Sequence, residues 1–146
     1  MIGEDGKKIK LGFGPAKGGA VRLGPVTRTL RLAEGMETSL AVQRLTGNGA
    51  SVWATLSTSG MIGFDIPDGV ERLEIYADGD RYRSHRRTGD LVKPPGIAAA
   101  EALQAKAIMQ NIEAVIYPSP EPDDWLDVWV SRFKDDHQQR NIEYRA

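Results

Sequence analysis

Hydrophobic positions follow two different periods along this chain, and the switch between them predicts the order of its elements. Short apolar runs rich in β-branched and aromatic residues predict strands over 30–34, 51–58, 72–78 and 112–120. Between them, apolar positions recur at helical spacing. This spacing predicts helices over 36–47, 96–110 and 123–133, and a short helical turn over 59–66.

The alternation of strands and helices predicts an α/β fold. Strands joined by helices form βαβ units with right-handed crossovers, and such units build a parallel sheet. We therefore expect a Rossmann-like, four-stranded parallel sheet with helices on both faces. Strands 30–34 and 72–78 are expected to be immediate neighbours in this sheet.

The two ends of the chain lack this regular pattern. Residues 1–25 are rich in glycine and predict an irregular N-terminal extension, in which 18–25 can form one short strand. A single domain is expected over 26–134, with an insertion at 81–95 between the third strand and its helix. Residues 135–146 are expected to form a polar C-terminal tail.

Composition narrows the classes of protein and of site. A chain of 146 residues is long enough for one domain with one core. The absence of cysteine excludes disulfides, thiol catalysis and cysteine-based zinc sites, and two histidines are too few for a His-rich metal site. The net charge of −1 means that any attraction to nucleic acid must be local. Apolar runs fall short of the roughly 20 residues of a membrane span, so we expect a cytoplasmic protein without membrane contact.

Acidic residues follow two of the predicted strands. Glu34 lies at the end of the first strand, and Asp78 and Asp80 lie at and just beyond the end of the third. Because ligands of open parallel sheets bind beyond the carboxyl ends of the strands, these carboxylates predict a Mg²⁺ site facing a phosphate substrate. Two simpler explanations stay open: an Asp-x-Asp pair in a solvated turn, and a Glu favoured by the dipole of the helix that follows.

A third acidic group follows the fourth strand and can join the same crevice: Asp123, Asp124 and Asp127. The alternative for Asp123 or Asp124 is a helix N-cap. In the helix that follows, aromatic residues recur every four positions and are expected to pack in the core: Trp125, Trp129 and Phe133.

The insertion at 81–95 is a local basic patch. It contains one acidic residue, Asp90, and five basic residues: Arg81, Arg83, Arg86, Arg87 and Lys93. Tyr82 and His85 are interleaved with them. Cationic side chains beside a metal site favour binding of a phosphate backbone, and an aromatic ring can stack on a base. A solvated loop is the alternative.

Four motifs together resemble the Toprim domain: AEGMET (33–38), VWATLS (52–57), ADGD (77–80) and DWLD (124–127). This catalytic module is shared by primases, topoisomerases, OLD-type nucleases and small ribosomal-RNA maturases. The likeness is greatest to Toprim domains of phage- and plasmid-associated primase or helicase proteins. It covers roughly residues 18–130, and Leu126 stands where those relatives tend to have Asn.

The resemblance implies a Toprim fold and roles for individual residues. Glu34 would act as a general acid or base in phosphoryl transfer, and Asp78 and Asp80 would coordinate Mg²⁺ or Mn²⁺. Glu37, Asp124 and Asp127 are candidates for further acids of the site. The implied partners are single-stranded DNA, nucleotides and further primase or helicase domains.

Two functions of different classes are compatible with these motifs. The first is Mg²⁺-dependent nucleotidyl transfer in DNA replication, by the Toprim module of a primase-like protein that lacks full activity alone. The second is a non-catalytic module that binds nucleic acid or nucleotides, or a small Toprim nuclease. Because primases also need a zinc-binding segment and polymerase elements, we expect either a piece of a larger protein or a small stand-alone Toprim protein.

Overall fold

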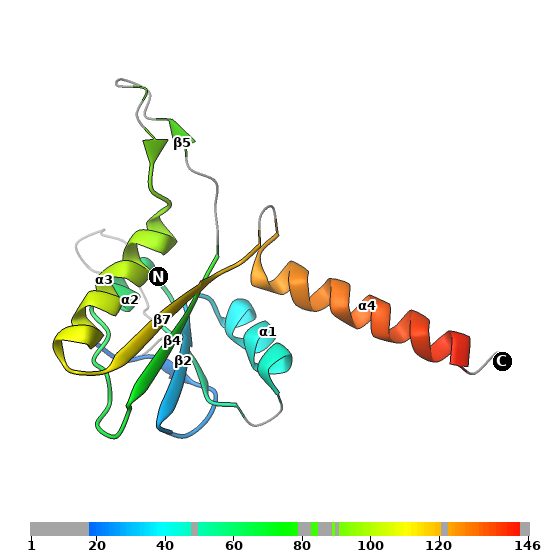
Figure 1. The fold of residues 1–146 in the computed structure, drawn as a ribbon, viewed down its shortest axis with the longest axis horizontal. Coiled ribbons are helices and arrows are strands. Elements are labelled where there is room, and N and C mark those ends of the chain that lie inside the picture. Colours follow the sequence, from blue (N-terminus) through cyan, green and yellow to red (C-terminus); the bar gives the residue numbers. More distant parts are fainter. Residues whose placement is uncertain are drawn as a thin grey trace, which may run out of the picture.

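A five-stranded sheet runs through the centre of the computed structural model, which describes residues 18–47, 50–78, 83–84, 89, 91–120 and 123–143. The strand order is β1-β3-β2-β4-β7 (Figure 1). The bounds are β1 Val21–Arg22, β2 Thr29–Ala33, β3 Val52–Ala54, β4 Arg72–Ala77 and β7 Glu113–Pro118.

The prediction of an α/β fold with a parallel sheet is confirmed. β2 pairs in parallel with both β3 and β4, and β4 pairs in parallel with β7. β1, from the segment expected to form one short strand, adds a fifth, antiparallel strand beside β3. β2 and β4 are neighbours as expected, with Ala33 opposite Tyr76.

Helices cover both faces of the sheet (Figure 1). α2 and α3 lie on one side, and α1 lies on the other. Their bounds are α1 Met36–Thr46, α2 Thr58–Ile62, α3 Pro95–Met109 and α4 Trp125–Glu143. Two short strands of the insertion pair with each other, apart from the main sheet: β5 Arg83–Ser84 and β6 Leu91–Val92.

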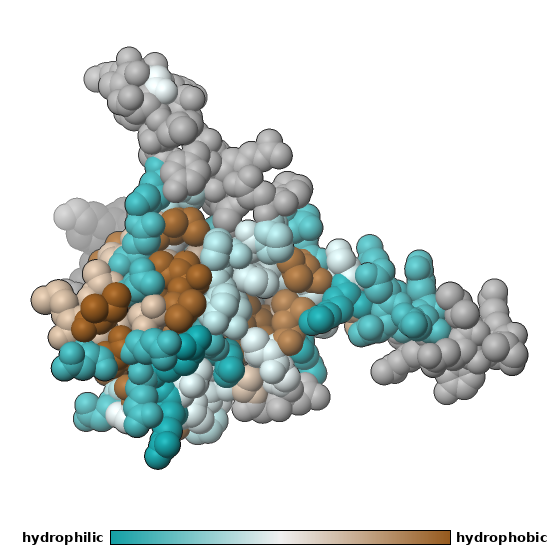
Figure 2. Space-filling model, viewed as in Figure 1, coloured by the Kyte–Doolittle hydropathy of each residue, from teal (hydrophilic) through white to brown (hydrophobic). Residues whose placement is uncertain are grey.

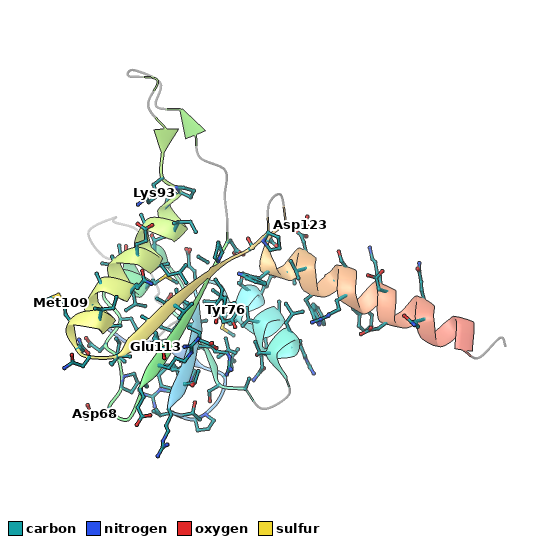
Figure 3. The ribbon with its side chains drawn as sticks, viewed as in Figure 1. Asp68, Tyr76, Lys93, Met109, Glu113 and Asp123 are labelled. Carbon is teal, nitrogen blue, oxygen red and sulfur yellow. The ribbon has the colours of Figure 1, made fainter. Side chains whose placement is uncertain are left out.

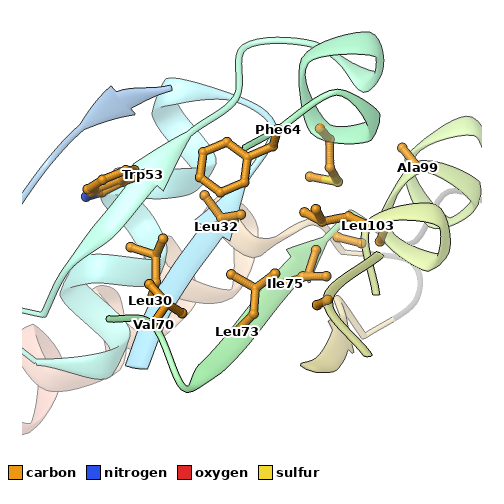
Figure 4. Close-up of a cluster of buried hydrophobic side chains, with 13 residues drawn as sticks. Leu30, Leu32, Trp53, Phe64, Val70, Leu73, Ile75, Ala99 and Leu103 are labelled. Atoms are coloured by element: carbon orange, nitrogen blue, oxygen red, sulfur yellow. The ribbon is translucent and has the colours of Figure 1, made fainter. Parts of the chain in front are cut away.

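The hydrophobic core lies between the central strands and the α2–α3 side (Figure 4). Leu30 and Leu32 of β2 alternate with polar residues, as do Leu73 and Ile75 of β4, so all four point to the same face. Alanines of α3, among them Ala99, are buried against them, because a side chain of this size lets a helix approach a sheet closely.

The other face of β4 is polar, which a buried central strand does not lead one to expect. Glu74 pairs with Arg31 at 2.9 Å, and Arg72 bridges Glu113 and the Tyr117 hydroxyl. These hydrogen bonds, that to Glu113 above all, raise the pKa of Arg72. The charged side chains on this face are therefore paired with one another, which avoids the free-energy cost of an unpaired charge in the protein interior.

α4 differs most from expectation. The helix continues to Glu143, beyond the predicted end at 133 and through most of the expected tail, because the sequence after Asp123 contains neither Gly nor Pro. It leads away from the sheet (Figure 1), and its coloured side chains beyond the base are mostly hydrophilic (Figure 2). The expected core packing is wrong for Phe133, a residue that is 54% exposed. In the described part of the chain, no helix is both long and apolar enough to cross a membrane.

We predict that Gly60→Ala destabilises the protein by about 1–3 kcal/mol. A Cβ at Gly60 would lie 2.2 Å from the main-chain carbonyl oxygen of Thr55, which cannot move without shifting the end of β3. Urea denaturation measures the effect. The matched control is Gly96→Ala near the start of α3, where a Cβ would meet other atoms only at 3.7 Å or more. This variant should be neutral or slightly stabilising, and equal losses in both variants would contradict a steric cause.

Candidate active site at the carboxyl ends of the strands

β2 and β4 end side by side at a cavity of about 280 Å³. Glu34 follows β2, Asp78 follows β4, and Asp124 precedes α4; all three line the cavity. Pro95 and Gly96, the first residues of α3, also line it, as do Thr58 and Met61 of α2. Figure 3 shows Asp123 at this end of the sheet, and Asp68 and Glu113 toward the opposite end.

Gly96 lies next to both strand ends. A Cβ at this position would be 3.7 Å from the carbonyl oxygen of Asp78 and 3.9 Å from Oε2 of Glu34. The Glu34 carboxylate and the Asp78 main chain therefore approach the same point from neighbouring strands. This proximity agrees with the expectation that the two acids share one crevice.

The Asp78 carboxylate is held by two hydrogen bonds from different helices. The hydroxyl of Thr38, in the first turn of α1, donates to Oδ2 at 3.2 Å. The main-chain N–H of Trp125, at the start of α4, donates to Oδ1 at 3.2 Å. Both oxygens are thus fixed while the residue still lines the cavity.

The main chain of Glu34 is anchored by the loop after β3. Thr55 N–H donates to the carbonyl of Ala33 at 3.0 Å, and Leu56 N–H donates to that of Glu34 at 2.7 Å. Leu56 has φ 70°, a left-handed conformation that a leucine rarely adopts. Such strain persists only where surrounding structure enforces it, and it is often found at functional sites.

Aromatic side chains support the start of α4. Tyr76 stacks on Tyr117 with ring centroids 5.1 Å apart, and it forms a T-shaped contact with Trp125 with ring centroids 5.3 Å apart. The Trp125 indole N–H also donates to the Tyr117 carbonyl at 3.3 Å. Burial raises the pKa of Tyr76 above its ordinary value. Trp125 is therefore attached to both β4 and β7.

The third acidic group caps a helix. Asp124 accepts from the N–H of Asp127 at 2.8 Å, and Asp127 accepts from the N–H of Asp124 at 3.1 Å. This reciprocal pair is a capping box, in which Asp124 is the N-cap. Asp124 also lines the cavity, whereas the described lining does not include Asp123 or Asp127.

The remaining predicted site residues lie elsewhere or outside the described part of the chain. Glu37 is exposed on α1 and is absent from the described lining of the cavity. Lys93 forms an ion pair with Glu101 of α3. Outside the described residues lie Asp80, Arg81, Arg86 and Arg87, and also the side chain of Arg83. Within the described part, no three His, Asp or Glu side chains form a group that could hold a metal ion.

Sequence reasoning missed three contributors to this site. Thr38 is the last residue of the AEGMET motif and lies in the first turn of the helix that follows Glu34. Its position in this motif is the feature of the sequence that could have identified it. The contribution of Trp125 is a main-chain N–H, which no side-chain pattern reveals. Tyr76, two residues before Asp78 on the same side of β4, could have been placed by strand alternation.

A larger cavity of about 620 Å³ lies away from the strand ends. Arg22, Trp53 and Asp65 are among its lining residues, and the Arg22 guanidinium lies 4.4 Å from the centre of the Trp53 ring. Although this cavity is larger, it contains neither of the strand-end acids, Glu34 and Asp78. The smaller cavity is therefore the better candidate for the active site.

This chain is similar to a known protein family and to a solved structure. The family model of the Toprim domain matches residues 29–135. A solved structure described as a DNA primase domain from Pseudomonas aeruginosa shares 14% identity, with a TM-score of 0.44. The similarity covers 70% of this chain and 29% of the other. No curated protein matches. Because the family match spans most of its length, the chain belongs to the Toprim domain family.

Proposed function

We propose that this chain carries out Mg²⁺-dependent phosphoryl or nucleotidyl transfer on nucleic acid, as the Toprim module of a primase-like protein acting in DNA replication. The observation that carries this proposal is that Glu34 and Asp78 line one cavity beside Gly96, at the carboxyl ends of two paired strands. The family match supports the same class of chemistry.

The donor atoms at the cavity are of the kind that suits a hard divalent cation such as Mg²⁺ or Mn²⁺, although the described carboxylates do not gather into a group of three ligands, so the proposed site needs Asp80 as well. Glu34, Asp78 and Asp124 offer carboxylate oxygens, the donors that Mg²⁺ prefers. A carboxylate oxygen can accept a hydrogen bond and coordinate a cation at once, so the contacts of Asp78 are compatible with this role. We assign the metal to Asp78 together with Asp80. When bound, the cation would neutralise charge that develops on the transferring phosphate.

In this proposal Glu34 is the general acid or base of the transfer reaction. A carboxylate is suited to general acid–base chemistry when its surroundings favour the protonated form near neutral pH. The anchored main chain of Glu34 keeps its side chain at the cavity.

The basic insertion would bind the nucleic acid. The segment starts after Asp78, which follows β4, and ends at Pro95, the first residue of α3. Both residues line the cavity, so the segment begins and ends at the site. We propose that single-stranded DNA contacts five of its side chains: Arg81, Arg83, Arg86, Arg87 and Lys93. The ion pair with Glu101 reduces the charge that Lys93 can offer. Nucleotides and further primase or helicase domains are the other partners of the proposal.

The transfer reaction is tested with Glu34→Gln and Asp78→Asn, which remove charge and keep shape. We predict that each lowers Mg²⁺-dependent nicking or primer synthesis by at least about 100-fold. Matched controls are Glu71→Gln and Asp68→Asn, at the opposite end of the sheet, which should keep activity.

Two results would contradict the proposed reaction. One is equal activity in the site variants and the controls. The other is wild-type protein that binds Mg²⁺ and DNA yet shows neither nicking nor synthesis, which would establish a binding module instead.

The nucleic-acid contact is tested by the salt dependence of binding. We predict that binding of single-stranded DNA weakens when four residues are changed to Ala: Arg81, Arg83, Arg86 and Arg87. The slope of the logarithm of the binding constant against the logarithm of the salt concentration should also become shallower by as much as about 3, because each lost phosphate contact removes about 0.7 from it. The control changes exposed basic residues elsewhere: Arg28, Arg132 and Lys134. Equal slopes in wild type and the loop variant would rule out the loop as the contact.

A further inference from the structure

We propose that Thr38 is a positioning residue whose hydroxyl holds the Asp78 carboxylate in the orientation that metal binding requires. This inference rests on the proposed function, because it concerns the same site. It assigns a role to a neutral side chain of α1 that acts through Asp78.

The environment of Thr38 makes its hydroxyl a directed donor. The residue is only 8% exposed, and its hydroxyl donates to Oδ2 of Asp78 at 3.2 Å, across forty positions of sequence. In a helix the χ1 angle of threonine is largely limited to two rotamers. The hydrogen bond to Asp78 selects the orientation in which the hydroxyl faces the end of β4.

The second oxygen of Asp78 is fixed by a separate element. Trp125 N–H donates to Oδ1, and the indole of Trp125 is attached to Tyr117 and Tyr76. Rotation of the carboxylate about its Cβ–Cγ bond would break both hydrogen bonds together. Thr38 and Trp125 thus define the plane of the carboxylate from two sides.

A fixed carboxylate plane matters for a cation that requires near-ideal geometry. Mg²⁺ tolerates little departure from octahedral coordination, so a freely rotating ligand binds it less well. Residues that orient metal ligands through hydrogen bonds typically contribute about 10–100-fold to metal affinity. Loss of the Thr38 hydroxyl should therefore reduce the affinity for Mg²⁺ even though Asp78 remains.

The neighbouring residue provides a matched control. Ser39 is fully buried, and its hydroxyl donates to the carbonyl of Gly35 at 2.8 Å, within the same helix. Ser39→Ala removes a buried hydroxyl one position away without touching Asp78. It reports how much any loss of a hydroxyl from α1 disturbs the protein.

The experiment measures Mg²⁺ affinity by calorimetry on the full chain, and thermal unfolding in parallel. Thr38→Val keeps the shape and removes the hydroxyl, and it should weaken Mg²⁺ binding by about 10-fold or more. Thr38→Ser, which keeps the hydroxyl, should bind within about 3-fold of wild type. Ser39→Ala should lower the unfolding temperature but leave the affinity unchanged.

The pair Thr38→Ser and Thr38→Ala decides the question should Thr38→Val not fold. These two variants share the loss of the methyl group, so only the hydroxyl separates them. Equal Mg²⁺ affinity in this pair, or wild-type affinity in Thr38→Val, would overturn the positioning role and leave the proposed function intact. Failure of wild-type protein to bind Mg²⁺ would refute the metal site itself.

Discussion

The parallel pairing of β2 with β4 is the constraint on which the site depends. Its register places Ala33 opposite Tyr76, so that Glu34 and Asp78 leave the sheet at the same edge. A shift by one residue would send one set of side chains to the other face of the sheet. The alternation of Leu30, Leu32, Leu73 and Ile75 toward the core prevents such a shift, since their burial would be lost. Core packing thereby places Glu34 and Asp78 at the same edge of the sheet.

The carboxylate of Asp78 joins elements that are distant in sequence. It follows β4, accepts a hydrogen bond from α1, and accepts another from the start of α4. The aromatic contacts among Tyr76, Tyr117 and Trp125 attach α4 to the sheet at this point, while the rest of the helix leads away from it (Figure 1). The motif around Trp125 therefore supports the site through its main chain and its rings as well as through Asp124.

The fold could be predicted from the sequence because strand and helix periods are clearly separated and the strand neighbours follow from parallel topology. The proximity of Glu34 and Asp78 followed from the same reasoning. The length of α4 could not be predicted from apolar periodicity, because its second half is polar and only the lack of Gly and Pro permits it. The exposure of Phe133 depends on the direction of this helix, which the spacing of apolar residues does not reveal. The hydrogen bond from Trp125 to Asp78 could not be predicted either, because its donor is a main-chain N–H.

If the strand-end carboxylates hold one divalent cation, a crystal soaked in Mn²⁺ should reveal it. We expect an anomalous difference peak in the cavity beside Gly96, within about 2.2 Å of an Asp78 carboxylate oxygen, with Thr38 and Trp125 still bonded to that carboxylate. A cavity without a peak at saturating Mn²⁺, or a peak bound only by other residues, would contradict the proposed metal site.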